Sequence, residues 1–192
     1  MLKFFITKVS ILFFSQIIYA QDIDKIIKDI DNYFFSLNEF SASFIQENEG
    51  ELQEGYFYKN DKRIRIDYNQ PTKITIILDK NKAMFFNRDL EEIEYFDPKK
   101  TIAKIIFEIF NNNLVENFNK HKIDKNIGKF YINVKHEKIN YLAEIVFELN
   151  PLELRMINIV SKEENISFGL RDHNFNYVFK KNFFSMANPL LK

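Results

Sequence analysis

The sequence predicts a mainly β protein of the α+β class, in which a curved antiparallel sheet carries its helices on one side. Three observations indicate this fold. An amphipathic stripe at the start of the chain is followed by several short segments in which apolar and polar residues alternate. After Pro98 the apolar residues recur with the spacing of a helix. In the last third of the chain they alternate with polar residues again. With 46% apolar and 16% aromatic residues, the chain can bury a sizeable core.

The N-terminus has the pattern of a secretory signal peptide. Lys3 and Lys8 make it positive, an apolar run covers residues 9–19, and the small residue Ala20 stands at the expected cleavage position. The run is short for a membrane span, which needs about 20 apolar residues; an uncleaved anchor is the alternative. We therefore expect residues 1–20 to be a signal peptide and residues 21–192 to form a single exported domain.

The stretch from Asp22 to Asn38 predicts the first helix. Its apolar residues recur every three or four positions and therefore share one face, and Asp22 is a suitable N-cap. That face must pack against a large apolar surface, which the following strands can provide. The apolar residues of this stripe are Ile23, Ile26, Ile27, Ile30, Tyr33, Phe34 and Leu37.

Six short alternating segments then predict an antiparallel meander, because they recur about every ten residues and are separated by turns rich in Asn and Asp. Alternation places every second side chain on the same face of a strand, so each segment offers one face to a core. The segments are FSASFIQ (40–46), EGYFYK (54–59), RIRIDY (63–68), KITIILD (73–79), KAMFFN (82–87) and EIEYF (92–96).

A short apolar helix is predicted after Pro98, which suits a first helical turn. Only Lys104 and Glu108 are polar between residues 102 and 110, so the helix is apolar nearly all round. The last third returns to strands with segments such as KFYINVKHE (129–137) and YLAEIVFEL (141–149). No internal repeat or Gly/Ser linker divides the chain.

The residue types argue against an enzyme or a metal protein, so we expect no catalytic residue, no metal and no cofactor. The absence of cysteine excludes disulfides, thiolate metal sites and a cysteine nucleophile. His121, His136 and His173 are not spaced as a metal motif, and there is no glycine-rich phosphate loop and no GxSxG elbow. Basic and acidic residues balance at 27 each, so nothing indicates nucleic acid binding.

The positive signal is a surplus of apolar surface. The helix at 102–110 and segments such as ITII (74–77) and AMFF (83–86) are apolar on more than one face. One interpretation is a well-filled core, which is what apolar stripes usually form. The other is a sheet curved into a half-barrel whose concave side holds a hydrophobic ligand beneath the apolar helix.

Several stretches match a known family. They are FSASFIQ after the first helix, QEGYFYKNDKRIRIDYNQP (53–71), IILDKNKAMFFN (76–87) and VSKEENISFGL (160–170). On these residues the chain resembles the periplasmic outer-membrane lipoprotein carrier (LolA) family, most densely between Phe40 and Asn87. It departs from the family pattern at Asn60, where a latch arginine is usual, at Lys80, where glycine is usual, and at Ile102, where proline is usual.

The resemblance implies an incomplete β half-barrel whose helical lid covers a cavity for acyl chains. By strand alternation we expect two sets of residues to form this site, and Arg63 and Arg65 to tether the lid or to face a transporter. The cavity set is Ile64, Ile66, Tyr68, Ile74, Ile76, Met84, Phe86, Ile93 and Tyr95. The lid set is Ile102, Ile105, Ile106 and Ile109.

The resemblance also implies the function and partners. A monomeric carrier in the periplasm would receive lipoproteins from an inner-membrane ABC transporter and pass them to an outer-membrane acceptor. Two alternatives remain open at the level of the sequence. One is a periplasmic adaptor that senses a lipid or a protein with the same half-barrel. The other is an exported hydrolase, which would require a carboxylate pair that no local motif reveals.

Overall fold

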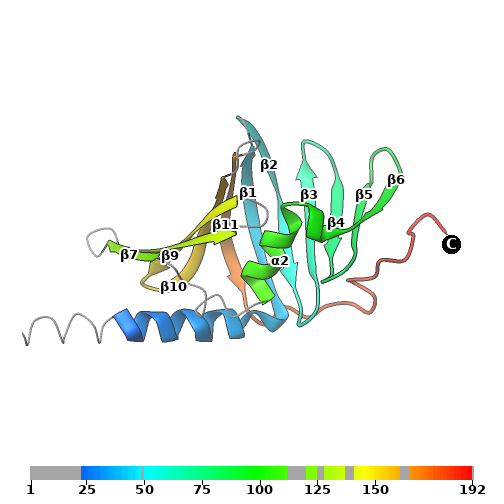
Figure 1. Ribbon diagram of the computed structural model, residues 1–192. Coiled ribbons are helices and arrows are strands. Elements are labelled where there is room, and N and C mark those ends of the chain that lie inside the picture. The colour runs from blue at the N-terminus through cyan, green and yellow to red at the C-terminus, as the bar shows by residue number, and fades with distance from the viewer. Residues whose placement is uncertain are drawn as a thin grey trace, which may run out of the picture.

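Eleven strands form one antiparallel sheet in the computed structural model (Figure 1), which describes residues 23–48, 50–111, 120–124, 128–136, 141–160 and 165–191. The predicted signal peptide lies outside these residues. The strands are β1 (Phe40–Asn48), β2 (Glu51–Lys59), β3 (Ile64–Gln70), β4 (Ile74–Leu78), β5 (Ala83–Asn87), β6 (Glu92–Phe96), β7 (Lys120–Asp124), β8 (Lys129–His136), β9 (Tyr141–Leu149), β10 (Leu152–Val160) and β11 (Asn165–Asn174).

The sheet is open. Its strand order is β6-β5-β4-β3-β2-β1-β11-β10-β9-β8-β7, so β6 and β7 stand at opposite edges and do not pair with each other. The first and last strands, β1 and β11, pair in the middle and join the two meanders. Figure 1 shows the sheet curling around α2 (Ala103–Asn111), which lies against its inner face. The predicted half-barrel with an N-terminal helix and a second, shorter helix is therefore confirmed.

The N-terminal helix, described over residues 23–35, packs on the same concave face as α2. It is followed by a 3-10 turn (Leu37–Glu39) that leads into β1. Ile30 and Leu37 are fully buried, as the apolar stripe predicts. The Tyr33 and Phe34 rings both meet Phe147 of β9 edge to face, with centroids 5.6 and 5.7 Å apart. The helix thus closes one end of the half-barrel. No helix among the described residues is long and apolar enough to cross a membrane.

Gly55 allows β2 and β3 to approach each other at an irregular point of their ladder, where the register shifts between Glu54 and Gly55. A Cβ atom at this position would overlap the backbone carbonyl oxygen of Asp67. Because that atom belongs to the neighbouring strand, it cannot move aside as a flexible side chain would. Gly169 in β11 has a similar setting within the sheet, but a Cβ atom there would sit 3.6 Å from the nearest atom, the carbonyl oxygen of Ile45.

We therefore predict that Gly55→Ala lowers the free energy of unfolding by about 2 kcal/mol or more, as forced overpacking does. Gly169→Ala is the matched control and should change it by less than about 1 kcal/mol. Urea unfolding of both variants measures the two values. Equal stabilities would show that β2 and β3 are not as close at Gly55 as described.

His173 in β11 is buried among aromatic rings beneath the N-terminal helix. Its ring centroid lies 5.5 Å from Phe40 and 6.5 Å from Tyr33. Nδ1 is 3.4 Å from Glu153 Oε2, yet neither ring nitrogen makes a hydrogen bond within the described residues. Arg155 Nη2 lies 2.8 Å from the same carboxylate oxygen and already neutralises it. Burial lowers the pKa of His173 more than Glu153 raises it.

The protein should consequently lose stability as the pH falls below about 6.5, the pKa of a free histidine. In that range the unfolded chain takes up a proton that folded His173 resists, so the loss reaches at most about 1.4 kcal/mol per pH unit. Thermal unfolding at about pH 7.5 and pH 5.5 tests this. The variant His173→Phe keeps an aromatic ring without a titrating group, and its Tm should fall less. An equal fall in both proteins would assign the acid sensitivity to other groups.

Candidate functional site

The helix α2 lies over the concave face and is held there by apolar contacts. Pro98 begins a 3-10 turn (Pro98–Lys100) that is capped by the Asp97 carboxylate, which accepts a hydrogen bond from the backbone N–H of Lys99. Four side chains of α2 are buried: Ile105, Ile106, Ile109 and Phe110. The Phe110 ring lies 4.5 Å from that of Phe57 in β2 and 6.4 Å from that of Phe34 in the N-terminal helix. The C-terminal end of α2 is thus wedged between strand and helix.

A mainly apolar cavity of about 390 Å³ lies beneath the N-terminal part of α2. Strands from both meanders form its walls, and the segment 101–106 forms its cover. Its size is at the lower end of small-molecule sites, which are typically about 300–1,000 Å³. The lining residues are Gln46, Ile66, Tyr68, Ile76, Leu78, Phe85, Glu94, Phe96, Thr101, Ile102, Ala103, Ile106, Ile159, Ile166 and Phe168.

The sequence assigned thirteen residues to the cavity and its cover. Nine of them lie where expected: five on the concave face of the sheet, and four in α2 or just before it. Ile66, Tyr68 and Ile76 line the cavity, and so do Ile102 and Ile106 of the cover. Ile64, Ile105 and Ile109 are buried in the adjoining core, against which Ile74 also packs. Strand alternation therefore gave the facing of β3 and β4 correctly.

The expected facing of β5 and β6 is wrong by one residue. Phe85 pairs directly with Ile76 of β4 and with Glu94 of β6, and all three line the cavity. Directly paired residues share a face. The four residues expected here lie on the opposite, convex face: Met84, Phe86, Ile93 and Tyr95.

The cause of this error is the turn between β4 and β5. Asp79 N–H donates to the Lys82 carbonyl, so Leu78 and Ala83 are directly opposite each other. Ala83 therefore shares the concave face with Leu78, and Phe85 follows it two residues later. A shift of one residue turns a whole strand over. In AMFF every residue is apolar, so alternation carries no information there; the length of the turn would have decided the facing.

Arg63, which directly precedes β3, and Arg65 of β3 lie on the convex face, opposite α2. Arg63 Nε pairs with Asp79 Oδ2 at 2.9 Å, and Arg65 Nε donates to both carboxylate oxygens of Asp67 at 2.9 and 3.1 Å. Their Nη1 atoms donate to the backbone carbonyls of Phe184 and Phe183, at 2.9 and 2.6 Å. Among the described residues they hold the end of the chain, so the prediction that they tether the lid is wrong. The alternative, that they face a transporter, stays a prediction.

The sequence reasoning missed this C-terminal segment, residues 175–191, which runs along the convex face of the β3–β6 half (Figure 1). The segment packs against the sheet through aromatic contacts. The ring centroids of Phe183 and Tyr58 lie 4.9 Å apart, and Arg65 Cζ lies 4.4 Å from the centroid of the same Phe183 ring. Burial raises the pKa of Tyr58 to about 12. Farther along, the Tyr95 hydroxyl donates to the Met186 carbonyl at 2.9 Å. The segment explains why Ile77 and Met84 are buried although they face away from the cavity.

We predict that Arg65→Gln loosens the C-terminal segment, because it removes a charged hydrogen bond and a cation–π contact, together about 2 kcal/mol. Limited proteolysis should then cut within residues 175–191 faster than in the wild type. Arg171→Gln is the control, since that side chain is 58% exposed and its polar partners among the described residues are Ser43 and Asp172. If both variants are cut at the wild-type rate, Arg65 does not anchor the segment.

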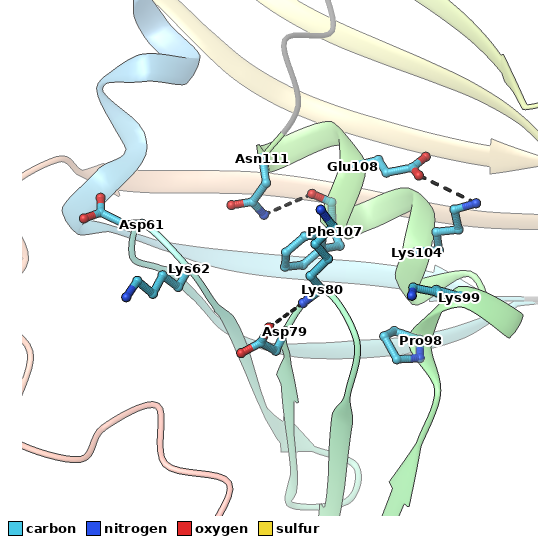
Figure 2. A pocket seen from close by; sticks show the side chains of 10 residues that line it. All are labelled: Asp61, Lys62, Asp79, Lys80, Pro98, Lys99, Lys104, Phe107, Glu108 and Asn111. Atoms are coloured by element: carbon cyan, nitrogen blue, oxygen red, sulfur yellow. Dashed lines mark hydrogen bonds and ion pairs between the residues drawn. The ribbon is translucent and has the colours of Figure 1, made fainter.

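A second hollow, of about 500 Å³, lies at the rim between α2 and the turns that follow β2 and β4. Figure 2 shows Phe107 pointing from α2 toward the turn with Asp79 and Lys80. The Lys104 and Glu108 side chains form an ion pair of 3.7 Å along the helix, and Asp79 is paired with Arg63. No group of three or more His, Cys, Asp and Glu residues is arranged to hold a metal in the described part of the chain.

The wall of the cavity contains one buried polar pair. The Tyr68 hydroxyl donates to Gln46 Oε1 at 2.8 Å. Burial raises the pKa of Tyr68, so its hydroxyl keeps its proton at any physiological pH. On the same concave face Lys59 is also buried, and its Nζ donates to the Asn60 carbonyl at 3.2 Å. Burial lowers the pKa of Lys59. The Asn60 side chain itself caps the turn by accepting from the N–H groups of Lys62 and Arg63.

The described residues thus form an open half-barrel with a mainly apolar cavity beneath a helix, the type of site that holds apolar ligands. Residues 36–187 match the family described as outer membrane lipoprotein carrier protein LolA, so the chain belongs to that family. The match covers β1 to β11, α2 and nearly all of the C-terminal segment. No curated protein is significantly similar to the chain in sequence.

Solved structures share the fold. An uncharacterized conserved protein from Thermus thermophilus superposes with a TM-score of 0.50 at 5% identity, covering 81% of this chain and 89% of that one. A DUF1329 family protein from Desulfovibrio piger also gives a TM-score of 0.50, at 9% identity, covering 84% and 97%. LprF from Mycobacterium bovis is more distant, with a TM-score of 0.41 at 10% identity, covering 80% and 93%. At these identities the two structures with a TM-score of 0.50 show a likeness of fold alone.

Proposed function

We propose that this protein is a periplasmic carrier of lipoproteins, which shields their acyl chains in the concave cavity and involves no catalysis. One observation carries the proposal: the only cover of the cavity in the described residues is the apolar segment 101–106 of a short helical insertion, not a strand of the sheet. Family membership supports it, because the family is described as a lipoprotein carrier.

The energetics of such a carrier follow from the apolar contacts of α2. Each buried CH₂ group of a cargo chain contributes about 0.8 kcal/mol. Ile102 and Ile106 occupy the cavity side of the cover, so an acyl chain gains most by taking their place on the strands. Exchange of one apolar group for another leaves no polar group unpaired. The empty and loaded states therefore differ little in free energy, which allows cargo to be both taken up and released.

The cellular setting is part of the same proposal. Residues 1–20 would direct export and be removed, and the remaining domain would work as a monomer in the periplasm. An inner-membrane ABC transporter would load it, and an outer-membrane acceptor would unload it. Two of the three carboxylates that line the rim hollow, Asp79 and Glu108, each form an ion pair with a basic side chain, which favours a binding role over hydrolysis.

A pair of aspartate substitutions tests the proposed cavity. Ile66→Asp places a charge in the cavity wall, and Ile106→Asp places one in its cover, and burying an unpaired charge costs several kcal/mol. We predict that the mature protein releases an acylated lipoprotein from membranes containing the transporter as a soluble complex, and that either variant captures at least about ten-fold less.

Ile93→Asp is the matched control, because Ile93 lies on the convex face of β6. It should capture cargo as the wild type does. Circular dichroism and thermal unfolding verify that all three variants are folded. Normal capture by both Ile66→Asp and Ile106→Asp would show that the acyl chains bind elsewhere.

A further inference from the structure

A pure hydrocarbon site would have no use for the polar pair in the wall of the cavity. Gln46 of β1 and Tyr68 of β3 are only 7% and 9% exposed, yet both line the cavity. Their neighbours in the wall are apolar, among them Phe168, Ile66 and Ile76. The Gln46 amide nitrogen is not among the fully buried, unpartnered atoms of the described residues, so it remains accessible to a partner. The pair therefore needs an explanation beyond packing.

The hydrogen bonds of the pair can be counted. Its donors are the two N–H bonds of the Gln46 amide and the O–H of Tyr68. The single bond between the two side chains uses one of these donors. Within the described residues neither side chain donates to any other group. Two donors of the pair consequently remain unused, and this is true for either orientation of the amide.

The lining residues also bear on which ligand charge the cavity can accept. Glu94 of β6, the edge strand of the sheet, lines the same space as the polar pair. No lysine, arginine or histidine of the described residues lines it. An anionic ligand group would meet a carboxylate and would have to lose its hydration, which is unfavourable in an apolar site. A neutral group that accepts hydrogen bonds meets neither obstacle.

We propose that Gln46, held in place by Tyr68, donates a hydrogen bond to the carbonyl oxygen of an acyl ester, so that the cavity selects neutral acyl esters over plain hydrocarbon chains and ionised fatty acids. The inference rests on the proposed function, because it assigns a chemical class to the chains that the cavity holds. The same hydrogen bond would fix how far a ligand enters the cavity, since the ester must stop beside Gln46 while the hydrocarbon tail extends over Ile66 and Ile76.

Displacement of the neutral fluorescent probe N-phenyl-1-naphthylamine tests this selection with the mature protein. The competitors are methyl laurate, tetradecane, which has the same chain length without a carbonyl, and laurate at about pH 8. Relative to the double variant described next, wild-type protein should bind methyl laurate about five-fold more tightly, the effect of one hydrogen bond. It should bind laurate about ten-fold or more weakly than the ester.

The double variant Gln46→Leu/Tyr68→Phe removes both polar partners at once, which leaves no orphaned group and preserves folding. Its affinity for methyl laurate should fall about five-fold, while tetradecane binds at least as well as before. Gln53→Leu is the matched control, because Gln53 pairs directly with Gln46 on β2 but does not line the cavity. It should keep the wild-type preference.

The outcomes separate this inference from the function on which it rests. If the double variant binds methyl laurate as tightly as the wild type does, or if the wild type binds laurate as tightly as the ester, the inference is overturned and the apolar cavity stands. If none of the ligands displaces the probe, the proposed function itself is wrong, and the inference is lost with it.

Discussion

The structure depends on one constraint: an open sheet with an apolar concave face must be covered by its own chain. In a closed barrel the strands face one another across the interior and fill it. Here β6 and β7 do not pair, so the sheet cannot do this. The N-terminal helix and α2 supply the missing contacts, with Tyr33 and Phe34 against Phe147, and Phe110 against Phe57. The helices thus complete the core as well as shape the cavity.

The two covers of the β3–β5 wall are held by different forces. On the concave side α2 makes non-directional apolar contacts, and its ion pair between Lys104 and Glu108 lies within the helix itself. On the convex side the C-terminal segment is fixed by directional hydrogen bonds from Arg63 and Arg65 to backbone carbonyls. Another apolar body can replace the first cover without leaving a polar group unpaired. Removal of the second would break the two hydrogen bonds from guanidinium groups to backbone carbonyls.

The sequence was informative where a strand has one apolar and one polar face. In RIRIDY the charged residues mark the convex side, so Ile64, Ile66 and Tyr68 could be placed from alternation. In AMFF no residue is polar, and the facing depends on the turn at Asp79–Lys82, whose geometry the composition does not specify. The partners of Arg65 and Arg63 lie 118 and 121 residues away along the chain, and no local pattern identifies them. The hydrogen bond between Gln46 and Tyr68 could not be predicted either, because no local sequence pattern shows which partner a glutamine on the inner face of a strand will have.

Because of the C-terminal segment, the folded unit extends beyond the last strand. By secondary structure the last element is β11, which finishes at Asn174, and a shortened gene would naturally be cut there. Such a product would expose the faces of Ile77 and Met84 and leave Arg65 without its backbone acceptor. The hydrogen bond from Tyr95 to the Met186 carbonyl is close to the last matched residue of the family, 187. The boundary of the domain is therefore set by a stretch without helix or strand, and fusion partners or affinity tags belong beyond it.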